Sequence, residues 1–447
     1  FLFKMKEEFK TSLFKTLPHQ EANDLYESLQ SNPTTSLRTN TKKTKLTPLN
    51  SHKVAHCNSA FYLNERPVFT ADPAFHAGVY YVQEANSMWI GRVFEYLRSL
   101  ITESVVVLDL CAAPGGKTTH ISSLMQASDL LVANEVISSR KNILAENVSK
   151  WGDGNTWVCS ADPMRFGNLG PLFDMVFCDA PCSGEGMFRK DPNAQYEWSL
   201  ENIALCSSRQ QRIVSDSWNC LKEGGYFVYS TCTFNTEENE ENVNFIIDSL
   251  GGELVDVSKI DPSGVLYCLK KYQYRCFPHR STGEGLFFAV IRKNSSPSKL
   301  IKNKAQRIEI KKSDINGFSY VGFRSKNWLI PNNHLQHLNL LYLLPGLFHV
   351  GTLFGDVFKG KWKPHPAIAL LVIESSLPLV EINDQEAMAY LRREFIPKKS
   401  TQHGVVIMRW FEFNIGISNS INNGLNNLWP MEWRVRNQFL CNTVFPR

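Results

Sequence analysis

Short runs rich in β-branched residues alternate with segments of helical periodicity from residue 105 onward, and this alternation constrains the fold more than any other feature. Such runs predict strands, and strands that alternate with helices are typical of βαβ units with a parallel sheet. The predicted strands are residues 105–110, 130–134, 156–160, 173–178 and 226–230, with 285–291 as a later addition. We therefore expect an α/β fold.

A loop of small residues joins the first predicted strand to a helix. The loop and the start of the helix consist of Cys111, Ala112, Ala113, Pro114, Gly115, Gly116 and Lys117. Small residues allow a backbone to approach a ligand closely, and the N-terminus of the following helix attracts negative charge. The loop lacks the G-x-G-x-x-G pattern, so we do not predict a nicotinamide dinucleotide here.

Acidic residues follow three of the predicted strands. Glu135 comes after the second strand, Asp162 after the third and Asp179 after the fourth. Each alone could be an ordinary surface acid, but open α/β sheets bind ligands at the carboxyl ends of their strands. A nucleoside with a positively charged group suits an acidic pocket. The candidate cofactor is therefore S-adenosylmethionine, a sulfonium with an amino-acid tail.

Two cysteines follow neighbouring strands, Cys182 after the fourth and Cys232 after the fifth. They could be packing residues, a redox pair or a catalytic pair. A redox pair would be expected as Cys-x-x-Cys, whereas these two lie 50 residues apart. Asn235 and Glu238 form a capping-box pattern, which predicts a helix whose positive end helps to lower a thiol pKa.

The rest of the chain falls into three further parts. Phe9, Leu13 and Leu17 recur at helical spacing before Pro18, and a polar basic stretch follows at residues 36–45. The segment from Arg292 to Lys312 contains eight Lys or Arg residues and one acidic residue, which indicates a basic linker. We expect an N-terminal α+β domain over 1–70, an α/β domain over 71–295, a basic linker over 296–312 and a separate smaller region over 313–447.

Composition argues against several classes of protein. Hydrophobic content of 43% and charged content of 20% are those of a globular chain, and a net charge of +5 is only mildly basic. No uncharged apolar run reaches 18 residues, so we expect no membrane span. The eleven irregularly spaced cysteines and the early charged residues predict reduced thiols and a cytoplasmic location. The cysteines and histidines lack metal-ligand spacing, so we expect no metal.

The longest motifs carry a resemblance to a known family. They are residues 111–118, residues 179–186, Arg189-Lys190-Asp191-Pro192 and Tyr229-Ser230-Thr231-Cys232-Thr233. This set resembles the Nop/Sun family of S-adenosylmethionine-dependent RNA cytosine-5 methyltransferases over about residues 36–292. Segments 351–355 and 426–430 resemble the bacterial subgroup that modifies small-subunit ribosomal RNA and carries a PUA-like tail. The resemblance implies a Rossmann-like class I methyltransferase domain over 71–295 that carries catalysis. It also implies a small N-terminal α+β domain over 1–70 and a C-terminal PUA-like α+β domain over 313–447, both RNA-binding.

The same resemblance implies roles for individual residues. Cys232 adds to carbon 6 of cytosine, because carbon 5 is too weak a nucleophile to take a methyl group directly. Asp179 hydrogen-bonds the ring near nitrogen 3, Cys182 assists release of the product, and Lys117 and Lys190 line the crevice. The implied cofactor contacts are residues 111–117, Glu135, Asp162 and Asp179. The target base must leave its stack, so single-stranded or transiently opened RNA is expected.

Other functions remain to be weighed against this one. A DNA cytosine-5 methyltransferase also uses a Pro-Cys after the fourth strand and a Glu-Asn-Val element, but Cys232 would have no role in it. A tRNA cytosine-5 methyltransferase and a non-catalytic ribosome assembly factor are the further alternatives. We expect a monomer that acts on ribosomal RNA or the small ribosomal subunit, helped by an RNA-contacting segment at 357–365 in which Lys359, Lys361 and Lys363 alternate with aromatics.

Overall fold

The computed structural model describes residues 5–294, 308–342, 344, 346–358, 361–372 and 376–446. Most of the expected basic linker over 296–312 lies outside these ranges, and Glu309–Lys312 at its end forms strand β14. Among the described residues, no helix is both long enough and apolar enough to cross a membrane.

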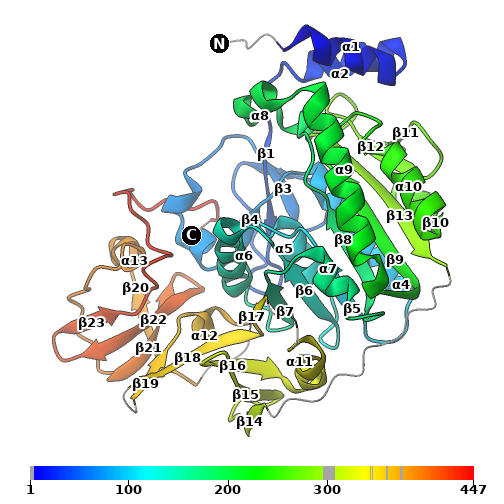
Figure 1. The fold of residues 1–447 in the computed structure, drawn as a ribbon. Helices are drawn as coiled ribbons and strands as arrows, with labels where there is room; N and C mark the ends of the chain where they lie inside the picture. The colour runs from blue at the N-terminus through cyan, green and yellow to red at the C-terminus, as the bar shows by residue number, and fades with distance from the viewer. Residues whose placement is uncertain are drawn as a thin grey trace.

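A largely parallel central sheet organises the molecule (Figure 1). Its parallel strands are β5 (Val106–Asp109), β6 (Leu130–Asn134), β7 (Thr156–Cys159), β8 (Phe173–Asp179) and β9 (Leu221–Thr231). Its antiparallel strands are β10 (Gly252–Leu254), β11 (Tyr267–Cys268), β12 (Gln273–Cys276), β13 (Leu286–Lys293) and β17 (Leu347–His349). The order is β11-β12-β13-β9-β8-β5-β6-β7-β17, with β10 paired to β13. All six strands predicted from the sequence are therefore present.

Helices cover both faces of this sheet, so its central strands are buried on both sides. The covering helices are α4 (Trp89–Ser99), α5 (Gly116–Leu124), α6 (Ser138–Trp151), α7 (Pro163–Gly167), α9 (Leu200–Ser217) and α10 (Glu240–Leu250). The short α8 (Pro192–Glu197) buries no residue and lies near α1 in Figure 1. Successive residues of one strand point to opposite faces: Leu108 packs in the cluster that contains α9 and α10, and Val107 in the cluster that contains α4 and α5. Each fully buried aliphatic side chain contributes about 1.5–3 kcal/mol.

The N-terminal part forms two helices and a small antiparallel sheet. Its elements are α1 (Glu7–Thr16), α2 (His19–Ser28), β1 (Thr35–Thr39), β2 (Ser51–Lys53), β3 (Ala60–Leu63), α3 (Pro73–His76) and β4 (Tyr80–Val82). The sheet has the order β2-β3-β1-β4, so it extends past the boundary expected at residue 70. Helix α1 packs on the catalytic part, since the Phe9 ring lies 5.0 Å from that of Phe188 and 5.5 Å from that of Trp198.

The C-terminal part contains two sheets instead of one separate unit. The first has the order β14-β15-β16-β18-β19, with β15 (Phe318–Phe323), β16 (Lys326–Pro331), α11 (Leu335–Leu341), β18 (Thr352–Phe358) and β19 (Lys361–Pro364). The second has the order β20-β21-β22-β23, with α12 (Ala367–Leu370), β20 (Leu379–Ile382), α13 (Asp384–Leu391), β21 (Gly404–Trp410), β22 (Phe413–Ile421) and β23 (Gly424–Asn427).

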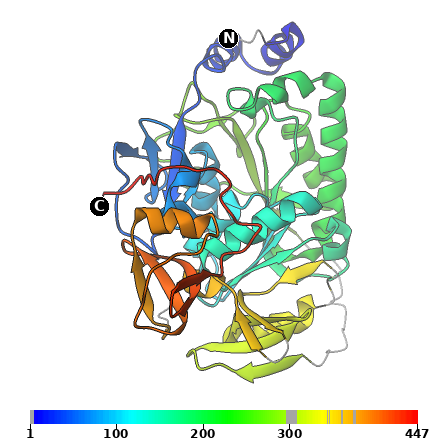
Figure 2. The same ribbon diagram turned by 90° about the vertical axis from the view of Figure 1, so that its left-hand side faces the viewer.

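The expectation that residues after 312 form a separate domain is wrong in one respect. Strand β17 pairs with β7 and extends the central sheet, and Trp328 and Leu347 belong to the same hydrophobic cluster as Leu108. The second C-terminal sheet packs on the N-terminal part (Figure 2), where Trp410 and Leu37 share a cluster. A three-residue strand gives no periodicity that would reveal this pairing from the sequence.

Candidate active site

The ends of β8 and β9 bring the two cysteines of the motifs together. The strands are parallel neighbours in which Asp179 pairs with Ser230, so the loops that follow them leave the same edge of the sheet. The Sγ atoms of Cys182 and Cys232 lie 3.2 Å apart, and the backbone N–H of Cys232 points at the Cys182 sulfur from 3.4 Å. Both are free cysteines, and neither is fully buried by its neighbours. The structure therefore places two adjacent thiols at one edge of the sheet.

The surroundings of the Cys182 thiol favour its protonated form. The hydrogen bond with the Cys232 sulfur, together with burial, raises the pKa of Cys182 well above its ordinary value. A thiol that keeps its proton is a poor nucleophile, so this shift argues against Cys182 as the attacking sulfur.

The helix expected directly after Cys232 begins later than predicted. Helix α10 starts at Glu240, and its N-cap residue Asn239 makes no side-chain capping bond. Asn235 and Glu238 do hydrogen-bond to each other, at 2.9 Å and 2.8 Å, but in the turn that precedes the helix. Glu238 also accepts from the backbone N–H of Ser183 at 3.0 Å. Its carboxylate therefore binds a distant part of the chain instead of capping a helix that starts after Asn235.

An ion pair stands beside the thiols. Lys117, in the first turn of α5, donates to Asp179 Oδ2 at 2.7 Å, and the Ser230 hydroxyl donates to Asp179 Oδ1 at 2.9 Å. Burial lowers the pKa of Lys117, but the charge and hydrogen bond of Asp179, with smaller effects of Cys232 and Asp109, outweigh burial and leave the pKa raised. Lys117 thus remains a cation that attracts negative charge on the Cys232 sulfur.

The loop of small residues is held in place at the carboxyl edge of the sheet. The backbone N–H of Ala112 donates to the Asn134 carbonyl at 2.8 Å, and Asn147 donates to the Pro114 carbonyl at 2.8 Å. Gly115, the N-cap of α5, has φ of 113°, a conformation that L side chains rarely adopt. Cys111 contacts Cys178, and that hydrogen bond together with burial raises the pKa of Cys178.

Acidic groups surround this loop, with differing degrees of burial. Glu135 is 4% exposed, accepts from the backbone N–H of Ile137 at 2.8 Å and lies 3.6 Å from Arg140. Asp162 instead caps α7 through the N–H of Met164 and its side chain is 44% exposed. A cationic ligand fits this acidic set.

Asp109 adds a buried acid below the loop. Burial raises the pKa of Asp109 to about 7, partly countered by a hydrogen bond from Thr118 at 2.6 Å, and the charges of Asp179 and Glu135 act in the same direction as burial. A sulfonium nearby would relieve this concentration of negative charge.

Lys190 occupies a different position from Lys117. Its amino group lies 3.8 Å from Glu284, which also receives a 2.7 Å bond from Arg189. Lys190 thus forms an ion pair with Glu284, which lies just before β13.

A buried glutamate that sequence reasoning did not single out joins the two cysteine loops. Glu185, in the short helix after Cys182, accepts from the backbone N–H groups of Phe234 and Asn235 at 2.6 and 3.0 Å and from the Trp198 indole at 2.8 Å. The residue is 2% exposed. Its place between Gly184 and Gly186 was visible in the sequence, but its partners 49 and 50 residues away were not.

The segment expected to contact RNA is only partly described. Lys359 lies outside the described residues, as does the side chain of Lys361. Trp362 is 40% exposed, and its ring stacks on Phe354 at 4.7 Å. Within the described residues no group of three or more metal-ligating side chains is present.

The central sheet, its covering helices and the site at its carboxyl edge define a class I methyltransferase fold. Three family models match the chain: 16S rRNA methyltransferase RsmB/F over residues 100–292, the N-terminal domain of 16S rRNA methyltransferase RsmF over 5–85, and the methyltransferase RsmF PUA domain over 378–435. The chain belongs to this RsmB/F family of methyltransferases. The resemblance to the bacterial small-subunit enzymes with a PUA-like domain is thereby confirmed.

Relatives and solved structures agree with this membership. Ribosomal RNA small subunit methyltransferase F of Vibrio cholerae is 32% identical over 422 residues, covering 88% of this chain and 86% of the relative. The protein of the same name from Erwinia tasmaniensis is 30% identical, covering 84% and 83%. A methyltransferase homologue from Pyrococcus horikoshii shares 26% identity with a TM-score of 0.54, covering 64% and 95%. NSun6 from Pyrococcus horikoshii, solved with SFG, shares the fold at 22% identity and a TM-score of 0.54, covering 66% and 100%.

Proposed function

We propose that this protein transfers a methyl group from S-adenosylmethionine to carbon 5 of a cytosine in 16S ribosomal RNA, through a covalent adduct of Cys232. Membership of the methyltransferase family and the names of the relatives support the reaction class and the RNA. The observation that carries the cytosine-5 chemistry is the pair of thiols 3.2 Å apart beside the Lys117–Asp179 ion pair.

Cys232 is the nucleophile in this proposal. Its thiolate adds to carbon 6, which places negative charge on the ring and makes carbon 5 able to attack an electrophilic methyl group. Asp179 hydrogen-bonds the ring near nitrogen 3 and stabilises the adduct. Lys117 keeps Asp179 in place and stabilises anionic charge in the crevice. The cofactor, when bound, supplies the methyl group.

Cys182 acts in the release of the product. After methylation, solvent water takes the proton from carbon 5, and the electron pair of that bond forms the ring double bond and expels Cys232 as a thiolate. The Cys182 sulfur lies 3.2 Å from that of Cys232 in the free protein and the pKa of its thiol is raised, so it can donate a hydrogen bond to the departing thiolate. Without that bond, elimination slows while attack and methyl transfer remain possible.

The cofactor is proposed to lie along the loop of residues 111–117. Glu135, buried at the end of β6, holds the ribose hydroxyls, as an acid about 20 residues after such a loop does in related pockets. Asp162 and Asp179 complete the acidic surroundings, although Asp162 also caps α7. Lys190 lines the substrate side of the crevice from its position against Glu284.

RNA binding and catalysis are assigned to different domains of the chain. We assign RNA binding to the N-terminal domain and to the region over 313–447, and catalysis to residues 71–295. Because β4 closes the N-terminal sheet at Val82, the boundary between these two domains moves from residue 70 to about residue 82. The proposed partner is ribosomal RNA or the small ribosomal subunit, bound by a monomer in the cytoplasm.

Label transfer tests the proposal. The protein is incubated with methyl-tritiated S-adenosylmethionine and with 16S ribosomal RNA, naked or in the small subunit, with tRNA and with DNA as comparison substrates. We expect label in 16S ribosomal RNA only, recovered as 5-methylcytosine after digestion. Label in tRNA or DNA would assign a different substrate, and label in another modified base would contradict the cysteine chemistry.

A further inference from the structure

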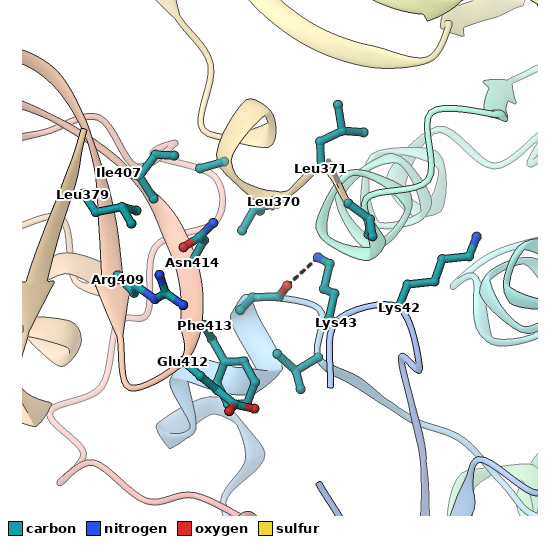
Figure 3. A pocket seen from close by; sticks show the side chains of 14 residues that line it. Lys42, Lys43, Leu370, Leu371, Leu379, Ile407, Arg409, Glu412, Phe413 and Asn414 are labelled. Carbon is teal, nitrogen blue, oxygen red and sulfur yellow. Dashed lines mark hydrogen bonds between the residues drawn. The ribbon is translucent and has the colours of Figure 1, made fainter. Parts of the chain in front are cut away.

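A large pocket lies away from the cysteines, between the N-terminal part and the second C-terminal sheet (Figure 3). Its volume is about 580 Å³, within the range of pockets that hold small organic ligands. One wall comes from Lys42 and Lys43, just after β1, and the opposite wall from β21 and β22. Because both domains contribute, the pocket exists only in the assembled chain.

The polar groups of the pocket are suited to a nucleotide. Arg409 and Asn414 lie on the paired strands β21 and β22, and Figure 3 shows both side chains on the wall opposite Lys43. The Arg409 guanidinium forms an exposed ion pair with Glu381, whose carboxylate lies 3.8 Å from Nε; this distance is too long for a hydrogen bond, so the N–H groups can turn to a ligand. Lys42 lines the opposite side, but its amino group donates to Asp153 at 2.7 Å and points away from Arg409 in Figure 3, so Arg409 is the cation that faces a ligand.

The remaining lining is apolar and suits the face of a base. It consists of Ala77, Val79, Ala369, Leu370, Leu371, Val372, Leu379, Ile407 and Phe413, with Glu412 as the acid. Leu379 is 44% exposed and stands at the mouth of the pocket. An unpaired base requires such a combination of apolar surface, a carboxamide or carboxylate for its edge and a cation for its phosphate.

The pocket is distant from the reacting base. Lys43 donates to the carbonyls of Lys150 at 2.6 Å and Ala77 at 2.7 Å, which fixes the pocket at the C-terminal end of α6. The N-terminal end of α6, at Ser138, follows Glu135 at the carboxyl edge of the sheet. At about 1.5 Å per residue the helix spans roughly 20 Å, so one nucleotide cannot occupy both places.

We propose that this pocket binds an unpaired nucleotide of the RNA substrate, with Arg409 at the phosphate and Asn414 at the base edge. The inference rests on the proposed function, because it takes RNA as the substrate. It adds a second contact that positions the RNA while the target cytosine is in the crevice. A single strand held at two points roughly 20 Å apart is restricted in register, which would narrow the choice of target.

Two variants distinguish binding of a nucleotide inside the pocket from binding of RNA to surface charge alone. Arg409→Ala removes a phosphate contact and leaves the cavity, whereas Leu379→Trp fills the mouth and leaves the charges. Lys311→Ala, which removes an ion-paired lysine that is 72% exposed, is the control. Filter binding of transcribed 16S ribosomal RNA to the full chain over a series of salt concentrations measures affinity and salt slope.

We expect Arg409→Ala to weaken binding and to reduce the log–log salt slope by about 0.7, the value for one phosphate contact to a single strand. Leu379→Trp should weaken binding beyond the control with an unchanged slope. Both variants should raise KM for RNA in the tritium assay and leave kcat unchanged. Thermal unfolding verifies that they are folded, and Asn414→Ala, which neither fills the pocket nor changes charge, replaces Leu379→Trp if that variant unfolds.

Wild-type affinity and slope in both pocket variants would overturn the inference. Weakening by Arg409→Ala alone would also overturn it, because a surface phosphate contact needs no pocket. Absence of methyl transfer to RNA by the wild-type protein would instead contradict the proposed function, and the two failures are thus distinguishable.

Discussion

Replacing Glu185 by glutamine should separate the effect of loop positioning from that of the thiols themselves. One carboxylate oxygen of Glu185 accepts from the N–H groups of Phe234 and Asn235, at 2.6 and 3.0 Å, and the other accepts from the Trp198 indole at 2.8 Å. These bonds connect the loop that carries Cys182 to the residues that directly follow Cys232. Glu185 is therefore a positioning residue.

The magnitude follows from the donors that glutamine leaves without a partner. The amide nitrogen of glutamine cannot accept a hydrogen bond, so at least one of the two carboxylate positions faces buried N–H groups with no acceptor. If that position is the one opposite Phe234 and Asn235, two donors are orphaned, each costing about 1–3 kcal/mol, and the free energy of unfolding should fall by about 2–6 kcal/mol.

Urea unfolding and steady-state kinetics measure the two consequences. Glu95→Gln, on a side chain that is 46% exposed, is the matched control and should change stability by less than about 0.5 kcal/mol. In Glu185→Gln we expect kcat to fall by about a hundredfold because the thiols are misplaced, with cofactor affinity unchanged. A loss of stability no larger than that of Glu95→Gln, with normal kcat, would refute the reasoning.

Two further predictions concern the acids near the cofactor loop. Glu135→Ala should weaken S-adenosylmethionine binding by about 1.5–3 kcal/mol, more than tenfold, because a charge-assisted bond to ribose is lost; calorimetry measures this, and an unchanged affinity would remove Glu135 from the cofactor site. The pKa of Asp109 is raised from 3.8 to about 7, so near neutral pH the folded protein holds a proton that the unfolded chain has released. The contribution of Asp109 to the free energy of unfolding is therefore complete below about pH 4 and is lost as the pH rises to about 7, by up to about 4 kcal/mol. Asp109→Asn keeps an acceptor for Thr118 but cannot ionise, so urea unfolding at several pH values should show a smaller decline than in the wild type; identical pH profiles would contradict the raised pKa.

The sequence predicted the central sheet because each strand is a short apolar run followed by a turn or small-residue loop. The periodicity located β5 to β9, and the position of acids and cysteines after those strands placed them at one edge. These are local signals. The same local signals predicted which side chains meet in the candidate site, including Cys182 and Cys232.

Long-range contacts account for what the sequence did not reveal. The capping-box pattern at Asn235 and Glu238 failed to start a helix because Ser183 and Gln210 bind the same carboxylate from distant parts of the chain. Strand β17 is too short for a periodic signal, and its pairing with β7 spans nearly 190 residues. The role of Glu185 likewise depends on partners from another loop.

The most direct test of the account is the fate of the covalent adduct in the two cysteine variants. Cys182→Ala retains the nucleophile but slows elimination, so RNA should remain attached to Cys232 and migrate slowly in a denaturing gel after incubation with S-adenosylmethionine. Cys232→Ala should form no such species and should not methylate RNA. An adduct in Cys232→Ala but none in Cys182→Ala would exchange the roles of the two thiols. Normal methylation by both variants would contradict the cysteine mechanism altogether.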